Sequence, residues 1–297
     1  MGEWNPMKAL VTGATGFLGG HLVHHLVNTG WSVDAIVRDP QAPRAREVER
    51  MGARLRIADS TTSTSDQVLE SQADGIFHLA THYLKTHTAQ DLEPLSRANL
   101  EFGIAVLDAA AASGTPVVST SSYFQFRGGA PHPSSLYAAT KQAWSTIAEY
   151  YADARGLRLN EVVMYDTYGP GDTRGKLVPL LTSAVRSGET VRLGNPDQPL
   201  NLTHAFDVAA GLAQLMTTPE NPRVTTMCAR ETVTTEELVH TFQELAPGRL
   251  TVEFNRSAPV NDLVTHAGNW PTPSGWAANV PLRTGIAGIL AGSDDLA

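Results

Sequence analysis

Eight residues near the N-terminus, Thr12-Gly13-Ala14-Thr15-Gly16-Phe17-Leu18-Gly19, narrow the choice of fold sharply. They follow an apolar run at 8–12, which predicts a buried strand, and precede a segment at 17–28 whose apolar residues have helical spacing. In such a turn one glycine permits the tight bend, a second admits a pyrophosphate, and a third lets helix pack on strand. The helix N-terminus adds free N–H groups for the phosphates. We therefore predict a dinucleotide site formed by Gly13, Thr15, Gly16, Phe17, Leu18 and Gly19.

Strand and helix patterns then alternate along the chain. Apolar runs at 31–37, 54–57, 75–80, 116–120 and 159–164 predict strands, and 95–112 and 137–154 predict helices. This alternation predicts an α/β fold with a Rossmann, doubly wound parallel sheet and helices on both faces. Beyond Gly169 the pattern loosens. We expect residues 1–170 to form the dinucleotide-binding domain, residues 204–229 to rejoin it, and residues 171–203 and 230–297 to form a smaller C-terminal substrate lobe.

Charge and composition limit the class of partner. Lys plus Arg number 22 and Asp plus Glu number 30, which gives a net charge of −8 and disfavours nucleic acid and anionic membranes as partners. No apolar run reaches the roughly 18 residues of a membrane span, and the N-terminus lacks a signal-peptide pattern. Cys228 is the sole cysteine, so no intrachain disulfide is possible. We expect a cytoplasmic protein with a small-molecule substrate.

The end of the second predicted strand bears on the choice of dinucleotide. NAD sites usually carry an acidic residue here for the ribose diol, whereas an arginine pairs with the 2′-phosphate of NADP. Val37 is followed by Arg38, which favours NADP(H). The alternative is that Asp39 binds the diol of NAD and Arg38 is merely solvated. Asp59 and Ser60 follow the third strand, where they contact adenine or form an ordinary surface turn.

Tyr137 and Lys141 begin a predicted helix and, four residues apart, share one of its faces. A lysine ammonium near a phenol lowers the pKa of the tyrosine, which can then give a proton to a carbonyl oxygen as hydride arrives. Ser121 and Ser122 end a strand upstream and offer a hydroxyl to the same carbonyl. The pattern predicts ketone reduction; the alternative is a solvated helix face.

Further segments carry a family resemblance: Phe77-His78-Leu79-Ala80, Asn99 to Gly103, Tyr168-Gly169-Pro170-Gly171-Asp172 and Phe206 to Ala209. With the glycine turn and Tyr137 to Lys141, they make nearly the whole chain resemble the extended short-chain dehydrogenase/reductases of the NAD-dependent epimerase/dehydratase family. The resemblance implies that Ser122, Tyr137 and Lys141 form a catalytic trio and that the protein is a monomer or homodimer. It also implies that the cofactor is held by Leu79, Ala80, Thr81, Asn99, Lys141, Tyr165 and Thr167.

Within that family the chain most resembles the nucleotide-sugar 4-ketoreductases of the CDP-abequose synthase type, on residues 120–125, 136–143 and 165–169. This implies NADPH-dependent reduction of a 4-keto-6-deoxysugar, as in deoxysugar or antibiotic biosynthesis. Tyr123 and Phe124 stand where a dehydratase of the family has an Asp-Glu pair, and neither transfers protons near neutral pH. A nucleotide-sugar epimerase stays an alternative, against which Arg38 argues mildly.

The sequence leaves two classes of substrate open. A diphosphate needs basic partners, for which Arg174 and Lys176 are candidates. Against this, Phe254, Leu263, Trp270 and Trp276 can line an apolar pocket for a polyketide-type aglycone or another natural-product ketone. Further substrate contacts are expected from His82, Tyr83, Ser121 and Tyr123.

Two other readings of the sequence are disfavoured. A regulator that binds cofactor without catalysis would not need a proton donor such as Tyr137. His78 and His82 have no acidic or cysteine ligands beside them, so no metal site is expected.

Overall fold

The computed structural model describes residues 6–218 and 220–292. At its centre is a seven-stranded parallel sheet in the order β13-β8-β5-β4-β1-β2-β3. The order runs outward from β1 in both directions, so the predicted doubly wound α/β fold is confirmed. Its strands are β1 (Lys8–Thr12), β2 (Ser32–Val37), β3 (Arg54–Ile57), β4 (Gly75–His78), β5 (Val117–Ser122), β8 (Leu159–Met164) and β13 (Val224–Met227).

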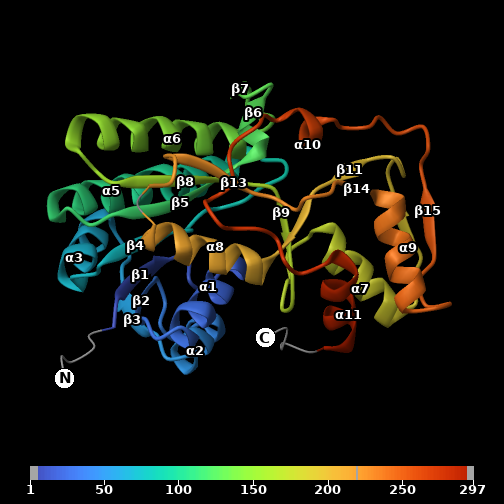
Figure 1. Ribbon diagram of the computed structural model, residues 1–297, viewed down its shortest axis with the longest axis horizontal. Coiled ribbons are helices and arrows are strands. Elements are labelled where there is room, and N and C mark those ends of the chain that lie inside the picture. The colour runs from blue at the N-terminus through green and yellow to red at the C-terminus, as the bar shows by residue number, and fades with distance from the viewer. Residues whose placement is uncertain (1–5, 219, 293–297) are drawn as a thin grey trace.

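Helices cover both faces of the sheet (Figure 1). On one face lie α3 (Thr61–Ser71), α5 (Phe102–Ser113) and α6 (Leu136–Arg155), and on the other lie α1 (Phe17–Asn28), α2 (Pro43–Arg50) and α8 (Ala205–Thr217). Each face has its own apolar core, one around Leu22, Phe77 and Leu212 and one around Leu107 and Trp144. Because both faces are buried, the strands are rich in apolar residues, as the sequence indicated.

The helical region before β5 is interrupted. In place of one helix over 95–112, the chain forms α4 (Leu92–Ser96), a π-helical turn at Arg97–Glu101, and then α5. Such a turn inserts an extra residue and re-aims side chains, and it is frequent at functional sites. Here it carries Asn99, which is 3% exposed.

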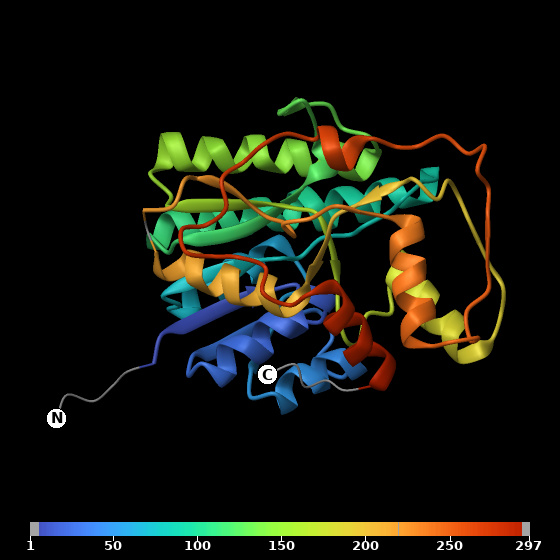
Figure 2. The same ribbon diagram turned by 45° about the vertical axis from the view of Figure 1, so that its right-hand side comes forward.

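The remaining elements form a smaller lobe at one end of the sheet, seen from two sides in Figures 1 and 2. It contains α7 (Leu177–Ser187), β10 (Val191–Leu193), α9 (Thr235–Leu245), β15 (Val252–Phe254) and α11 (Leu282–Ala291), packed around Leu181, Phe242 and Ile286. Between these elements the chain returns to the main sheet as α8 and β13. Short pairs join the two parts: β9 (Asp166–Tyr168) with β12 (Leu202–His204), and β11 (Pro199–Leu200) with β14 (Val233–Thr234).

The other short elements lie near the carboxyl end of β5. They are a hairpin of β6 (Phe126–Arg127) and β7 (Ala130–Pro131), and α10 (Leu263–His266), which is bound to it through the backbone of Gly128 and Gly129. None of the helices in the described part of the chain has both the length and the apolar character to cross a membrane.

Candidate active site

The glycine turn makes close backbone contacts that only glycine allows. Gly13 has a φ of +71°, and a Cβ there would lie 2.6 Å from the amide nitrogen of Ala80. At Gly19 a Cβ would lie 2.0 Å from the carbonyl oxygen of Gly13. The turn is closed by a 2.9 Å hydrogen bond from the Gly16 amide to Gly13. The backbone therefore has the tight form that a phosphate cradle requires.

The first turn of α1 suits an anion. Gly16 is the N-cap, no side chain caps the helix, and no acidic residue lies in the first turn. The N–H groups that begin a helix have no partner within it and attract phosphate together with the helix dipole. A dinucleotide fits this cradle on both counts, shape and polarity.

Arg38 and Asp39 follow β2 and are both exposed. The Asp39 carboxylate accepts a 2.8 Å hydrogen bond from the Gln41 amide, which turns it toward its own backbone. Within residues 6–218 and 220–292, no hydrogen bond or ion pair occupies the Arg38 guanidinium. Arg38 thus stays available for a phosphate group.

Asp59 and Ser60 have local partners. Ser60 caps α3 by accepting a 3.2 Å hydrogen bond from the Ser63 amide, and Asp59 accepts one of 3.1 Å from the Ser63 hydroxyl. Their side chains therefore stabilise the start of α3, and their contact with adenine remains a prediction.

Asn99 fastens the loop that follows β4. Its side-chain oxygen accepts hydrogen bonds from the Thr81 hydroxyl at 3.1 Å and the His82 amide at 2.6 Å. Its amide nitrogen donates to the His82 carbonyl at 3.1 Å and to the Thr140 hydroxyl of α6 at 2.9 Å. One buried side chain thus ties the loop after β4 to the helix that carries Tyr137. The loop begins with Leu79 and Ala80, which adjoin Gly13.

The three expected catalytic residues come from two neighbouring elements. Ser122 ends β5, and Tyr137 and Lys141 lie one turn apart at the start of α6, which Ser135 caps. Lys141 is 4% exposed and its ammonium donates to the carbonyl oxygen of Thr120 on β5. The ammonium also lies 5.5 Å from the centre of the Trp144 ring. The lysine is therefore fixed between α6 and the sheet.

Burial controls the protonation of both Tyr137 and Lys141. It raises the pKa of Tyr137 to about 12, against the opposing effects of a hydrogen bond with Thr81 and the charge of Arg174. Burial likewise lowers the pKa of Lys141 to about 8, against the opposing charge of Glu161. Desolvation thus dominates the Tyr137 pKa, and the effects that lower this pKa come from Thr81 and Arg174; the expected effect of Lys141 is not among them. A neutral phenol is the form that donates a proton.

Aromatic rings border this site. Tyr83 meets Tyr137 edge-on with ring centres 5.0 Å apart, and Tyr123 stacks on Tyr165 at 4.9 Å and on Phe124 at 4.2 Å. Trp270 packs on Phe126 of the adjoining hairpin, and Leu263 joins the same apolar cluster. Tyr83, Tyr123 and Tyr165 were expected at the substrate or the cofactor, whereas Phe124 was considered only as a residue that cannot transfer protons.

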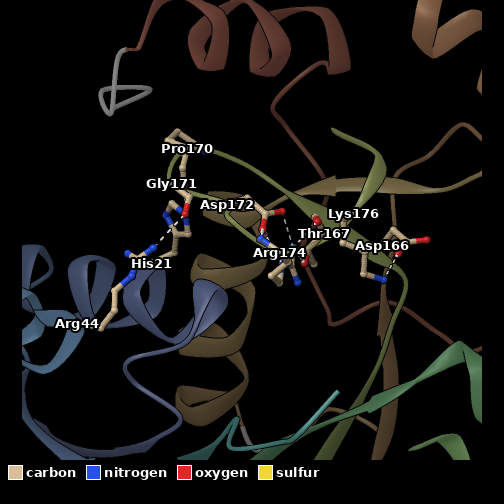
Figure 3. A network of polar contacts seen from close by, with 9 residues as sticks. All are labelled: His21, Arg44, Asp166, Thr167, Pro170, Gly171, Asp172, Arg174 and Lys176. Atoms are coloured by element: carbon tan, nitrogen blue, oxygen red, sulfur yellow. Dashed lines mark hydrogen bonds and ion pairs between the residues drawn. The ribbon is translucent and has the colours of Figure 1, made fainter. Parts of the chain in front are cut away.

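Two basic side chains expected to bind substrate already have carboxylate partners (Figure 3). Arg174 makes two 2.8 Å hydrogen bonds to Asp172 and one to the Thr167 carbonyl, and it lies 4.2 Å over the Phe17 ring. Lys176 pairs with Asp166 at 3.0 Å and lies 4.6 Å from the centre of the Tyr83 ring. Both line a cleft of about 560 Å³ formed by residues 169–176 and the first turns of α7.

The rest of Figure 3 links this segment to the first domain. His21 of α1 contacts the Pro170 carbonyl at 3.0 Å, and Arg44 of α2 donates to the Gly171 carbonyl at 3.3 Å. The segment that carries Arg174 and Lys176 is therefore bonded to the helices next to the glycine turn.

Several expected or suggested substrate residues lie away from the site. Trp276 packs in the core against α8, with its indole N–H donating to the Asp207 carbonyl at 2.8 Å, and Phe254 is partly buried against the core of the lobe. Neither residue lines the cleft beside Arg174 and Lys176. The Ser121 hydroxyl is buried and lies 3.4 Å from the Val162 carbonyl, inside the sheet.

Sequence reasoning missed two acidic residues. The Asp166 carboxylate accepts hydrogen bonds from the Lys176 ammonium at 3.0 Å and from the Tyr123 hydroxyl at 3.1 Å. Glu161 is 5% exposed and accepts a hydrogen bond from Ser145 of α6. A glutamate inside the apolar run at 159–164 was a signal that could have been followed. Among the described residues, no group of three or more His, Cys, Asp or Glu side chains is arranged to hold a metal ion.

The chain is similar to known proteins in sequence and in fold. The model of the "NAD dependent epimerase/dehydratase family" matches residues 9–227. CDP-abequose synthase of Yersinia pseudotuberculosis is 25% identical over 213 residues, covering 71% of this chain and 73% of that protein. Ceramide reductase of Caulobacter vibrioides is 34% identical over 211 residues, covering 70% of this chain and 61% of that protein. UDP-glucose 4-epimerase of Thermus thermophilus, solved with NAD, has the same fold, with a TM-score of 0.81, 22% identity, and coverage of 96% and 98%.

Proposed function

The chain belongs to the NAD-dependent epimerase/dehydratase family, and we propose that within this family it is an NADPH-dependent ketoreductase that acts on a nucleotide-linked 4-keto-6-deoxysugar. The observation that carries the reaction type is the buried, neutral phenol of Tyr137, one turn of α6 from the buried, charged Lys141. A protein of this family is an NAD(P)-dependent oxidoreductase, and a proton donor poised at the cofactor side of the sheet suits reduction.

The cofactor would be held by the chain's own backbone and a few side chains. The glycine turn and the first turn of α1 would bind its diphosphate, and Arg38 its 2′-phosphate. Thr81, Asn99 and Lys141 would border its nicotinamide half, as would Tyr165 and Thr167. When bound, the cofactor supplies a hydride to the carbonyl carbon of the ketone.

The protein's part of the reaction is proton transfer and orientation. Tyr137 donates the phenolic proton to the carbonyl oxygen, so that ketone, hydride and proton give the alcohol. Ser122 donates a hydrogen bond to the same oxygen and orients it. The charged Lys141 lowers the cost of the phenolate that Tyr137 becomes, and a proton from solvent restores the phenol afterwards.

Replacement of Arg38 by Ala tests the choice of cofactor. We expect NADPH affinity to fall about tenfold or more, because a charge-assisted contact to the 2′-phosphate contributes about 1.5–3 kcal/mol. NADH affinity should stay close to that of the unmodified protein. Fluorescence titration with each nucleotide measures both. Equal losses for NADPH and NADH would show that Arg38 does not read the 2′-phosphate.

The nucleotide-sugar substrate is supported by relatives and by the cleft beside Arg174 and Lys176. CDP-abequose synthase and a dTDP-4-dehydro-6-deoxy-D-allose reductase of a Streptomyces are both similar to this chain. The cleft of about 560 Å³ has room for a nucleotide, and its two cations can meet a diphosphate if they leave Asp172 and Asp166 in part.

An apolar ketone, such as a polyketide-type aglycone, is the second candidate. Specific observations favour it: Arg174 and Lys176 are both paired with carboxylates, and the Tyr83 ring meets Tyr137 edge-on. The relative at 34% identity is a ceramide reductase, whose named substrate is a lipid. The reaction and the proton donor would be the same.

Lys176→Met separates these two candidates. With dTDP- and CDP-linked 4-keto-6-deoxyglucose, we expect KM to rise about tenfold, and more at low salt, because the diphosphate loses a cation. Arg256→Met, in the same lobe but 67% exposed, is the charge-matched control and should leave KM unchanged. An unaltered KM in Lys176→Met, with a higher KM for an aromatic ketone in Phe124→Ala, would favour the apolar substrate.

A further inference from the structure

Glu161 is a buried acidic residue to which the proposed reaction gives no role. It lies in the middle of β8, between Ser119 of β5 and Val224 of β13, and is 5% exposed. A carboxylate loses its hydration on burial, and such groups are rare in protein interiors unless they are paired. The groups that contact Glu161 on the α6 side of the sheet therefore determine whether it is charged and what role it has.

Hydrogen bonds join this carboxylate to the helical turn that follows Lys141. Ser145, four residues after Lys141 on α6, donates to Glu161 Oε1 at 2.6 Å, and its hydroxyl lies 3.0 Å from the Lys141 carbonyl. Burial raises the pKa of the Glu161 carboxyl, and the hydroxyls of Ser145 and Ser121 and the charge of Lys141 oppose that rise. Two hydroxyl donors of this kind stabilise the charged form of a carboxylate.

The same network reaches the backbone of Ser122. Gln125 Nε2 donates to the Ser145 hydroxyl at 3.2 Å, and Gln125 Oε1 accepts from the Ser122 amide at 2.8 Å. Gln125 is completely buried. The network therefore connects Glu161 to both elements that carry the expected catalytic residues.

The charges around Lys141 leave Glu161 as its anionic neighbour. The lysine ammonium is bonded to a neutral carbonyl, that of Thr120. On β4, His78 is neutral near pH 7, because burial and the charge of Lys141 lower its pKa to about 3. Glu149 of α6 is exposed and acts on Glu161 by like-charge repulsion. Attraction to Glu161 is what opposes the burial of Lys141 and favours its charged form.

We propose that Glu161 is a positioning residue, the buried counter-charge of Lys141, held by Ser145 so that the lysine, one turn of α6 from Tyr137, stays charged. The catalytic significance of this pair rests on the proposed function, but the pair itself does not. Removal of the negative charge should make Lys141 lose its proton at a lower pH, because burial then acts without opposition.

The chain's four lysines, Lys8, Lys85, Lys141 and Lys176, make the test direct. In protein labelled with ¹³C at lysine Cε, each lysine gives one resonance that reports its protonation, and the Lys141→Arg variant identifies the resonance of Lys141. In Glu161→Gln we expect Lys141 to titrate roughly one pH unit lower than in the unmodified protein. The other three lysines should titrate as before. An unchanged Lys141 titration would overturn the proposal.

Two further variants keep the result interpretable. Glu149→Gln removes a charge from the same helix but from an exposed position, so Lys141 should titrate as in the unmodified protein. Ser145→Ala leaves the carboxylate but removes its hydroxyl donor, and should lower the Lys141 titration by less than Glu161→Gln does. If Glu161→Gln does not fold, an unshifted Lys141 in Ser145→Ala rejects the proposal. These titrations report the charge of Lys141 whether or not the protein reduces ketones.

Discussion

Turnover should collapse in Tyr137→Phe while the fold and the affinity for NADPH survive. The substitution removes one hydroxyl, and loss of a general acid costs about 10²–10⁴-fold in rate. The ring remains to meet Tyr83 edge-on, so packing at the site is retained. NADPH oxidation in the presence of the keto sugar, followed at saturating cofactor, measures the loss in kcat.

The control is Tyr150→Phe, which removes a phenol from the same helix at a position 55% exposed. It should have the kcat of the unmodified protein. Near-normal turnover in Tyr137→Phe would mean that the proton comes from another group, and the assignment of Tyr137 as donor would be withdrawn.

Gly19→Ala should impair both the fold and cofactor binding. Its Cβ would lie 2.0 Å from the Gly13 carbonyl oxygen and 2.8 Å from the Ala14 Cα, so the turn or the helix must move. Overpacking of this kind typically lowers the free energy of unfolding by about 1–3 kcal/mol. The atoms that the Cβ would meet belong to the backbone, so they cannot rotate away as a side chain can. We expect a lower free energy of unfolding in urea and a loss of NADPH affinity of about tenfold or more.

Gly20→Ala is a matched control one residue along the same helix. There the nearest atom to a Cβ is the Ala14 carbonyl oxygen at 3.9 Å, an ordinary contact. The free energy of unfolding should be unchanged or slightly higher, since alanine favours helix over glycine. Similar losses in Gly19→Ala and Gly20→Ala would contradict the steric account of the turn.

The sheet and its strand–helix alternation were predictable because buried parallel strands and amphipathic helices have distinct apolar patterns. The strands at 8–12, 54–57 and 159–164 have the bounds expected, and the family and the enzyme class inferred from the motifs are confirmed. Of the helices that cover the main sheet, two were missed, α2 and α3. In α2 only Ala45 and Val48 are buried, and α3 is rich in Ser and Thr, so neither has a strong apolar stripe.

Side-chain partners were harder to predict than elements. The sequence suggested that Arg174 and Lys176 are free to bind a diphosphate. In the structure Arg174 pairs with Asp172 and Lys176 pairs with Asp166, both from the same segment of the chain. The sequence left Trp276 open between a pocket and the core, because an aromatic ring suits either a core or a binding site. It fills the space that Gly211 leaves on α8, where a Cβ would lie 2.5 Å from the indole nitrogen. Such pairings depend on tertiary contacts that local pattern does not contain.

The strand order has a consequence for synthesis on the ribosome. β13 completes the sheet beside β8 and α8 covers α1, yet both follow the first elements of the lobe in the chain. Until they are made, the nascent chain presents the unpaired edge of β8 and the bare apolar side of α1. We therefore expect the main sheet to be completed only after the first elements of the lobe have been made. The ribosome must translate part of the lobe before all seven strands of the sheet are available. During this interval we expect the nascent protein to depend most on chaperones.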